Sequence, residues 1–478
     1  MITWNNCFSS KRFGKDIIID EARSAYEKDW DKLIFSSPFR RLQNKTQVFA
    51  LPEENFVHNR LTHSLEVASV GRLLGKIIGQ KIATLEGVKK DDQSRTFYES
   101  DLREVIASAC LAHDLGNPPF GHSGEEAISK YFKKRDTNNL EDKIFKSQFS
   151  PCEWEDLISF EGNANTLRIL TMKQKNTIET DFNLTYITLA SILKYPCESS
   201  ASNKSVLHRK KYGYFKNDEQ SFLTIVKEVN MQQEDSAEII YKRHPFVYLV
   251  EAADDICYNI IDFEDSHRLG ILSYEDVKDS FIEIIKMNNR PDHVKDVILK
   301  AELMGNYPDE SIAYLRTQAI NSLVFKCIDV FWNNKEEILS GDYKKSLIES
   351  IPAFKASFQK IKDISFNKIY NAKKVVELEI AAFRILSCLV KDFVDAALTP
   401  QMDRDKEQRK IIRLLPIQFR FEESETPYEK VMHILDFISS MTDIFALKLY
   451  RKLRGIEVLH SSNIHPILFL EGEHDDQY

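Results

Sequence analysis

The sequence "HDLGNPPFGHSGE" runs from His113 to Glu125 and concentrates residue types that are scarce elsewhere in the chain. The whole protein of 478 residues has only 15 glycines and 14 prolines, and five of these residues fall here. The preceding segment, "VIASACLA" at 105–112, is almost wholly apolar. A carboxylate such as Asp114 at the end of an apolar helix is costly to bury unless its charge is compensated. A divalent cation held by His113 and Asp114 would supply that compensation.

The second half of this stretch predicts a sharp turn followed by a new helix. Gly116 is expected to end the apolar helix, and Pro118 and Pro119 to force an extended turn. Ser123 is then placed to cap a helix that starts around Gly124. The stretch therefore predicts two helices joined by a rigid connection.

His122 and Glu125 stand three residues apart at the start of the second helix, so their side chains can meet. A carboxylate bonded to one ring nitrogen orients an imidazole, and the other nitrogen can then accept or deliver a proton. We therefore interpret this pair as a candidate catalytic pair. The alternative is a His–Glu pair that only stabilises the turn.

The rest of the chain is typical of a mostly α-helical protein. Apolar residues recur with helical spacing in several long segments. These segments are 61–78, 101–114, 183–194, 245–265, 309–332, 372–398 and 428–453. Only "VLHRKKYGYFK" at 206–216 resembles a short β-hairpin. We expect a helical core with the metal and catalytic residues at 1–270, and a C-terminal helical lobe at 271–478 that completes a nucleotide pocket.

Charge and cysteine content limit the class of protein. The net charge is −8, which gives no reason to expect nucleic acid as the main partner. The basic cluster "HRKK" at 208–211 can meet phosphates or form a solvated loop. The seven cysteines form no CxxC pair, so reduced thiols and a cytoplasmic location are expected. No apolar run is long enough to span a membrane.

Three apolar helices carry a recurring set of candidate metal ligands. His63 lies near the start of the helix at 61–78, and Asp254 interrupts the apolar helix at 245–265. Together with His113 and Asp114, they form the pattern H…HD…D. Imidazole and carboxylate groups together suit ions such as Mn, Fe, Zn, Co or Mg.

Two further groups lie close to these candidates in sequence. Asp254, Tyr258 and Asp262 follow an i, i+4, i+8 spacing, so they share one helix face. That face suits a sugar, with the ring against the ribose and a carboxylate on its 3′-hydroxyl. Arg60, three residues before His63, can reach phosphate oxygens.

The pattern H…HD…D resembles the HD superfamily of metal-dependent phosphohydrolases, and more closely its bacterial dGTP triphosphohydrolases. The segments that carry this resemblance span most of the chain. They are 35–49, 59–67, 113–125, 160–170, 194–196, 210–216, 243–265, 369–386 and 436–450. The resemblance implies hydrolysis of dGTP, or of other dNTPs, to a deoxynucleoside and inorganic triphosphate.

The resemblance also implies roles for individual residues. The metal would be held by His63, His113, Asp114 and Asp254, and the catalytic pair would be His122 and Glu125. The phosphates would be faced by Arg60, Asn163, Lys194, Tyr195 and Lys211. The base and sugar would be contacted by Gln47, Val48, Tyr258, Asp262, Tyr370 and Glu379. A carboxylate at Glu379 accepts hydrogen bonds from guanine N1–H and N2–H, which adenine does not offer.

Two alternatives remain open at this point. Another HD enzyme, such as a 5′-nucleotidase or a cyclic-nucleotide phosphodiesterase, would use the same metal ligands but release other products. A nucleotide sensor or single-stranded DNA binder without catalysis would be favoured by loss of a ligand, and all four ligands are present. The resemblance further implies a tetramer or hexamer, and an effector that is a dNTP or single-stranded DNA.

Overall fold

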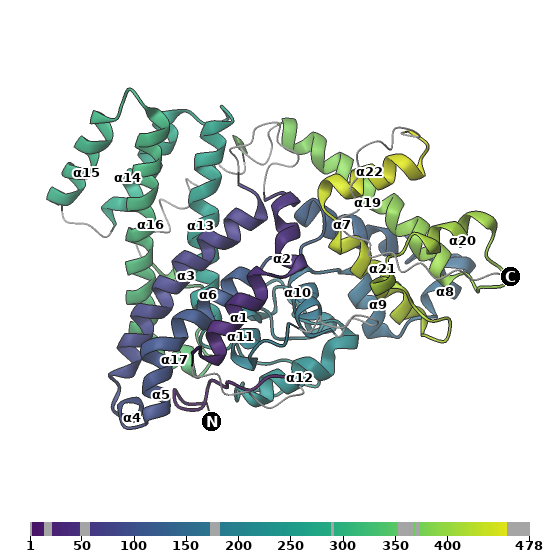
Figure 1. The fold of residues 1–478 in the computed structure, drawn as a ribbon, viewed down its shortest axis with the longest axis horizontal. Helices are drawn as coiled ribbons and strands as arrows, with labels where there is room; N and C mark the ends of the chain where they lie inside the picture. Colours follow the sequence, from purple (N-terminus) through teal and green to yellow (C-terminus); the bar gives the residue numbers. More distant parts are fainter. Residues whose placement is uncertain are drawn as a thin grey trace.

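The computed structural model describes residues 2–13, 22–47, 58–172, 182–287, 291–351, 363, 367–368 and 373–456. Helices dominate these ranges, as Figure 1 shows. Within them the only β-type pairing consists of three isolated bridges, such as the one between Thr46 and Asn59. The mostly α-helical fold predicted from the sequence is confirmed.

The longer helices are connected by turns and by short 3-10 segments. The helices of the N-terminal half are α1 (Ala25–Ile34), α2 (Ser37–Arg41), α3 (Arg60–Ala83), α4 (Glu86–Lys89), α5 (Asp92–Thr96), α6 (Leu102–Ala112), α7 (Gly121–Lys133), α8 (Leu140–Lys146), α9 (Pro151–Ile158), α10 (Gly162–Thr171), α11 (Tyr186–Ile192) and α12 (Glu219–Glu228). Those that follow are α13 (Val247–Arg268), α14 (Tyr274–Lys286), α15 (Pro291–Leu303), α16 (Pro308–Asn333), α17 (Lys335–Leu339), α19 (Lys373–Leu398), α20 (Lys406–Arg413), α21 (Pro427–Ser440) and α22 (Asp443–Leu453). The other short elements are the five-residue π-helix η2 (Phe97–Asp101) and the 3-10 turns η1 (Leu42–Asn44), η3 (Ser199–Ala201), η4 (Leu207–Arg209), η5 (Lys216–Asp218), η6 (Ile348–Ser350) and η8 (Ile417–Phe419).

Two local expectations from the sequence were wrong. The segment 206–216 contains the 3-10 turn η4 and no strand, so the predicted hairpin does not form. The segment 428–453 is two helices, because Met441 is extended and the side chain of Thr442 caps α22 by accepting from Phe445 N. Apolar spacing continues across this break, so periodicity alone could not reveal it.

The start of α7 also differs from the prediction. Ser123 does not cap the helix, which begins at Gly121. Phe120 precedes it in the left-handed conformation (φ 63°, ψ 17°) and makes no side-chain cap. Gly121 is also left-handed (φ 59°), and a Cβ there would lie 2.6 Å from Nη2 of Arg60. The turn before His122 is therefore tighter than capping rules suggest.

Helices α3 and α6 pack unusually closely. Gly71, Gly75 and Gly79 line one face of α3, and at each position an added Cβ would crowd residues 98–110. At Gly71, for example, the Cβ would lie 2.5 Å from Sγ of Cys110. This close approach brings the start of α3 to the end of α6, where the candidate metal ligands stand.

The buried apolar residues form two clusters, which we call the first core and the second core. The first core is built mainly by α1, α3, α6 and α11 to α17. The second core is built mainly by α7, α9 and α19 to α22, with loop residues between 197 and 240. Residues 271–351 pack in the first core and 382–446 in the second, so the region expected as one C-terminal lobe contributes to both.

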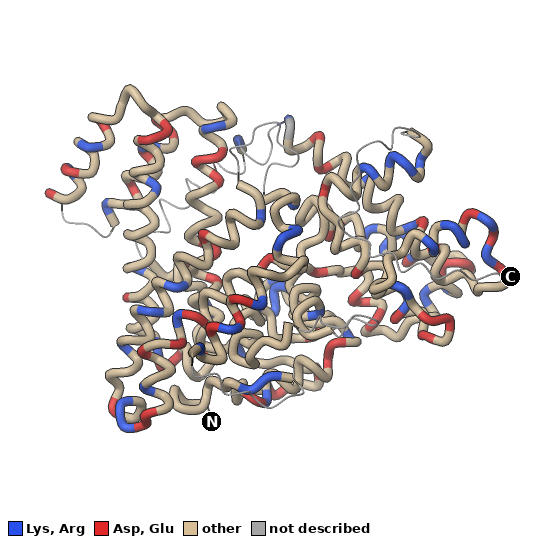
Figure 2. The backbone as a smooth tube through the Cα atoms, in the orientation of Figure 1, with Lys and Arg blue, Asp and Glu red and all other residues tan. Residues whose placement is uncertain are grey.

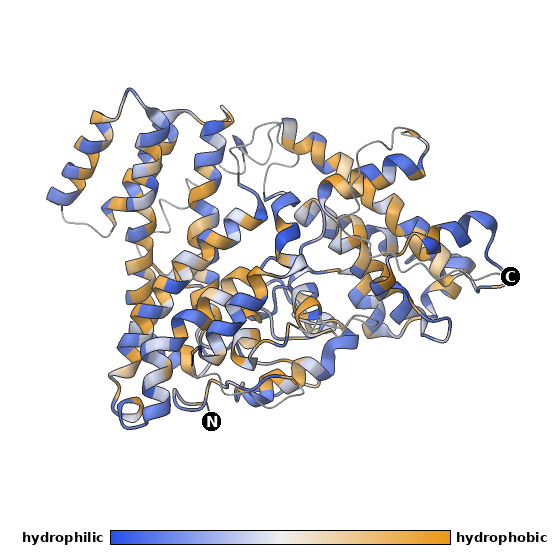
Figure 3. Cartoon of the chain, viewed as in Figure 1, coloured by the Kyte–Doolittle hydropathy of each residue, from blue (hydrophilic) through white to orange (hydrophobic). Residues whose placement is uncertain are grey.

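Surface properties agree with the composition. Lys and Arg are interspersed with Asp and Glu along the tube in Figure 2. Hydrophobic residues run along α16 and α19, whereas α20 is mostly hydrophilic, as Figure 3 shows.

All seven cysteines are free thiols. Among the described helices, none combines the length and the apolar character that a membrane span requires.

Candidate active site

A cavity of about 520 Å³ lies where the two cores meet, a size typical of small-molecule sites. Its walls come from α3, the turn after α6, α10, α11 and α13 on one side and from α7 and α19 on the other. Of the predicted site residues, the following line it: Gln47, Arg60, His113, Asp114, His122, Glu125, Asn163, Lys194, Tyr195, Lys211, Asp254, Tyr258 and Glu379. Residues up to 332 positions apart in sequence (47 and 379) therefore share one cavity.

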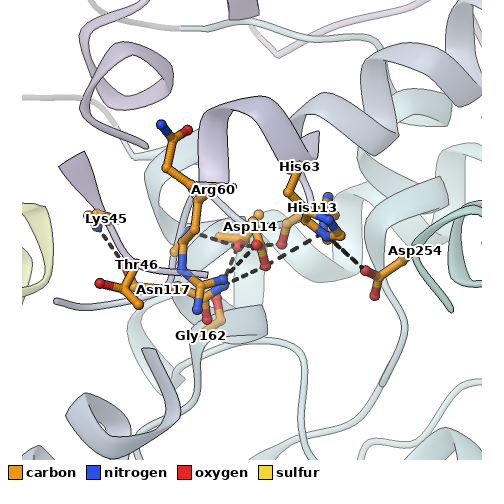
Figure 4. A network of polar contacts seen from close by, with 12 residues as sticks. Lys45, Thr46, Arg60, His63, His113, Asp114, Asn117, Gly162 and Asp254 are labelled. Atoms are coloured by element: carbon orange, nitrogen blue, oxygen red, sulfur yellow. Dashed lines mark hydrogen bonds and ion pairs between the residues drawn. The ribbon is translucent and has the colours of Figure 1, made fainter. Parts of the chain in front are cut away.

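His63, His113 and Asp254 form a group suited to a metal ion. One potential ligand atom from each lies within 4.8 Å of the others. Nε2 of His63 is 3.2 Å from Oδ1 of Asp254, and Nε2 of His113 is 3.5 Å from the same oxygen. Figure 4 shows the three side chains converging from their separate helices.

The hydrogen bonds of His113 fit such an ion. Its Nδ1 lies 2.6 Å from the carbonyl oxygen of Cys110, which fixes Nδ1–H as the donor. Its Nε2 is buried and has no hydrogen-bond partner, and the same holds for Nδ1 of His63. The unpaired Nε2 of His113 beside the Asp254 carboxylate is what a ligated cation would require, so the residues present fit a divalent metal.

Asp114 stands beside this group and is held by two other side chains. Its Oδ2 accepts a hydrogen bond of 2.6 Å from Nη1 of Arg60, and its Oδ1 accepts one of 2.5 Å from Nδ2 of Asn117. Burial opposes its ionisation, but Arg60 and His113 lower the pKa of Asp114 to about 2. Asp114 is therefore ionised, and its Oδ1 lies 3.5 Å from Nε2 of His113.

No hydrogen bond joins His122 to Glu125, both of which the structure describes, so that expectation was wrong. Glu125 instead accepts from Gly162 N at 2.8 Å and pairs with Nζ of Lys211 at 3.7 Å. The His122 ring opens to the cavity, and burial, followed by Lys211 and Arg60, lowers its pKa to about 4. His122 is thus a neutral imidazole near pH 7.

Two lysines at the cavity wall are held by carboxylates that we had not singled out from the sequence. Nζ of Lys211 donates to Oε1 of Glu161 at 2.9 Å, and Nζ of Lys194 lies 3.5 Å from Oε1 of Glu251. Burial disfavours both ammonium groups, yet Glu125 and Glu161 raise the pKa of Lys211, and Glu251 raises that of Lys194. Both lysines are therefore cationic.

Glu251 is itself fixed by Arg243, which forms a two-point pair with distances of 2.8 and 3.1 Å. It lies one turn before Asp254 on α13, so helical spacing offered a signal that we did not use. Of the basic cluster at 208–211, Lys210 and Lys211 line the cavity, while Nε2 of His208 pairs with Glu234 at 2.9 Å.

The residues expected to meet the sugar and the base are placed less uniformly. Gln47 lines the cavity with its amide oxygen buried and unpartnered, and Glu379 is exposed on the wall formed by α19. Tyr258 also lines the cavity, but Asp262 is buried outside its lining. Val48 and Tyr370 lie outside the described residues.

Comparison with known proteins agrees with this geometry. The HD domain family matches residues 60–163, and the phosphohydrolase-associated domain matches residues 348–452. A deoxyguanosinetriphosphate triphosphohydrolase-like protein of Synechocystis is 34% identical over 463 residues, which cover 95% of this chain and 100% of that protein.

Two further relatives are similar over slightly less of the chain. A deoxyguanosinetriphosphate triphosphohydrolase-like protein of Listeria innocua is 33% identical, with 91% of this chain and 95% of that protein covered. A deoxyguanosinetriphosphate triphosphohydrolase of Yersinia pestis is 30% identical over 502 residues, with the same coverages of 91% and 95%. The chain therefore belongs to the deoxyguanosinetriphosphate triphosphohydrolase-like family of HD-domain phosphohydrolases.

Proposed function

We propose that this protein hydrolyses dGTP, or a closely related dNTP, to the deoxynucleoside and inorganic triphosphate with the help of a divalent metal ion. The observation that carries the proposal is one shared cavity lined by His113, Asp254, the imidazole of His122 and several cationic side chains. His63 lies buried directly behind this lining, within ligand distance of His113 and Asp254. The names of the relatives support dGTP as the substrate.

His63, His113, Asp114 and Asp254 would hold the metal, which we expect to be Mg or Mn, or else Co, Fe or Zn. A divalent ion at this position supplies Lewis-acid polarisation of a phosphoryl oxygen. Arg60 supports the arrangement because it holds Asp114 ionised and in place.

The cations at the wall would bind the triphosphate. Lys194 and Lys211 each have a carboxylate partner, so neither is buried as an unpaired charge. A triphosphate would compete for these ammonium groups and add charge-assisted hydrogen bonds. Asn163 and Tyr195 would complete this wall.

His122 would transfer a proton to the departing 5′ oxygen, either directly or as a relay. Its low pKa results from burial and from the nearby Lys211 and Arg60. A bound triphosphate would pair with these two cations and so raise the pKa of His122 toward neutrality. The ring would then gain the ability to hold a proton when substrate is present. Glu125 would act by positioning Lys211.

Sugar and base recognition would come from residues on both sides of the cavity, Tyr258 on α13 and Glu379 on α19. The ring of Tyr258 against the ribose would exclude a 2′-hydroxyl, and the unpartnered oxygen of Gln47 is available to accept from the nucleoside. Glu379 would accept from guanine N1–H and N2–H. Four further points stay predictions. They are the roles of Val48, Asp262 and Tyr370, assembly into a tetramer or hexamer, an effector that is a dNTP or single-stranded DNA, and a cytoplasmic location.

The test is incubation with each of the four dNTPs and with GTP, in Mg or Mn, followed by chromatography of the products. Deoxynucleoside and intact triphosphate are expected, fastest from dGTP. Orthophosphate or a nucleoside monophosphate would instead identify another type of HD phosphohydrolase. His122→Ala and Asp254→Ala are expected to abolish turnover, and only Asp254→Ala to weaken metal retention. Near-normal turnover of His122→Ala would contradict the proton-transfer role.

A further inference from the structure

Asp443 is a buried carboxylate of the C-terminal region that bonds two backbone N–H groups and one hydroxyl of cavity-lining residues. It is the first residue of α22, and its side chain is 1% exposed. Its Oδ1 accepts from Phe120 N at 2.9 Å, and its Oδ2 accepts from Thr46 N at 2.9 Å and from the Thr46 hydroxyl. One side chain thus joins two segments that are far apart in sequence.

The first of these segments is held in an unfavourable conformation. Phe120 is left-handed, a conformation that is unfavourable for a residue with a side chain and persists only when the surroundings impose it. The hydrogen bond to Asp443 is such a constraint, because it fixes the direction of the Phe120 N–H. Phe120 and Gly121 together set the direction in which α7 leaves the turn, and therefore where His122 points.

The second segment leads directly to Gln47 and contacts the HD motif through its neighbour Lys45. Nζ of Lys45 donates to the carbonyl oxygens of Asn117 at 2.5 Å and Ser439 at 2.7 Å. Asn117 in turn donates to Asp114 (Figure 4). Lys45 therefore connects the end of α21 with the turn after α6, which supports the candidate metal ligand Asp114.

A carboxylate whose only role was to hold the C-terminal helices against the rest of the protein would not need to bond Phe120 and Thr46. Asp395 on α19 illustrates that simpler role, because it bonds side chains at the far end of α7, the hydroxyl of Tyr131 at 2.6 Å and Arg135 at 2.8 Å. Asp443 instead bonds the backbone of Thr46, one residue before Gln47, and of Phe120, two residues before His122.

We propose that Asp443 is a positioning residue, which fixes the left-handed turn before His122 and the segment before Gln47. The phosphohydrolase-associated region would thereby complete an active site whose metal ligands all come from the HD part of the chain and α13. The kinetic consequence rests on the proposed function, whereas the structural consequence does not.

The first test is hydrogen exchange by mass spectrometry on Asp443→Asn. The amide keeps the size of the side chain but replaces one acceptor by a donor, so peptides that contain residues 46 and 120 should exchange faster. Asp395→Asn is the matched control, and it should leave both peptides unchanged. Thr46→Val is a milder variant that should speed exchange near residue 46 but not near residue 120. Unchanged exchange in Asp443→Asn at both peptides would overturn the proposal, whether or not the protein hydrolyses dNTPs.

The second test asks whether the conformation of Phe120 is what Asp443 supplies. Asp443→Asn should lower kcat by roughly 10- to 100-fold, as expected for misplaced reacting groups, with Mn²⁺ binding unchanged. Glycine adopts the left-handed conformation freely. In a Phe120→Gly background the same substitution should therefore cost much less in kcat. An equal loss in both backgrounds, or the same loss in Asp395→Asn, would identify a merely structural role.

Discussion

The two cores contribute different parts of the cavity. The first core supplies His63, His113 and Asp254 from helices whose close packing leaves little freedom. The second core supplies the helices α7 and α19, which carry His122 and Glu379. His122 and Glu379 are both exposed to the cavity, whereas His63 is buried.

This difference indicates that the two sides of the cavity serve different functions. Buried charges need fixed partners, and the first-core wall provides them for each candidate ligand that the structure describes. The α19 part of the second-core wall, which carries Glu379, can vary its side chains without disturbing these partners. We therefore expect substitutions on the first-core side to remove chemistry, and those on α19 to change only which nucleotide is used.

The largest effect is expected for Asp254→Asn. His113 and His63 lower the pKa of Asp254 well below its ordinary value despite burial, so the ionised form is the working one. Metal retention should fall by about 100-fold or more, since even a supporting residue costs up to about that factor. Equilibrium dialysis with Mn²⁺ and the dGTP assay would measure both losses.

Asp255→Asn is the matched control for that substitution. Burial raises the pKa of Asp255 to about 7, although Lys194 opposes the shift. An amide imitates the protonated form of this carboxyl, so metal retention should change little. Equal losses in the two variants would show that the choice of Asp254 as the ligand is wrong.

A smaller effect is expected for Lys211→Gln. It removes a cation that Glu161 and Glu125 hold at the cavity wall, and kcat/KM should fall by about 100-fold, as for other lost donors to a reacting oxyanion. Lys210→Gln removes the adjacent exposed lysine, for which a much smaller change is expected. Steady-state kinetics on dGTP would compare the two, and similar losses would contradict the assignment.

Glu379→Gln should alter substrate choice more than rate. The amide offers one acceptor and one donor to guanine instead of two acceptors, so the preference for dGTP over dATP should fall by about 10-fold. Competition between the two nucleotides in one reaction measures this ratio directly. Glu377→Gln, on the same helix but outside the cavity lining, should leave the ratio unchanged. An unaltered ratio in Glu379→Gln would remove Glu379 from the base pocket.

The smallest effect on activity is expected for Asp156→Asn, which tests the second core alone. Burial raises the pKa of Asp156 from 3.8 to about 7, although hydrogen bonds from Ser199 and Tyr428 favour its ionised form. Between these two pKa values the native state binds a proton that the unfolded chain releases. The contribution of this carboxyl to the free energy of unfolding therefore falls as the pH rises from 3.8 to about 7.

The amide does not titrate, so Asp156→Asn should lose this contribution, which is at most about 1.4 kcal/mol per pH unit. Urea denaturation of both proteins at pH 5, 6 and 7 would reveal the difference in slope. Turnover at pH 7 should match the wild type. Parallel stability curves would show that Asp156 does not carry this proton.

The sequence predicted the helical fold and the long helices well, because their apolar spacing is regular over many turns. Most of the site residues that it predicted, and that the structure describes, line the cavity. It did not predict the break between α21 and α22, the left-handed Phe120 or the partners of Lys194 and Lys211. These features depend on contacts between distant segments, such as Lys211 with Glu161, and local patterns do not contain them.

By itself, the sequence determined which residue types stand on which helices, and hence that His113, Asp114 and Asp254 would need compensation for burial. The tertiary structure decided which groups supply this compensation. It also left His122 and Glu125 without a mutual hydrogen bond, and Glu125 instead contacts Lys211 and Gly162. The physical reason is that hydrogen bonds and ion pairs act over a few ångströms in space. Spacing along a helix fixes which side chains can meet, but only the packing of the two cores selects the pairs that form.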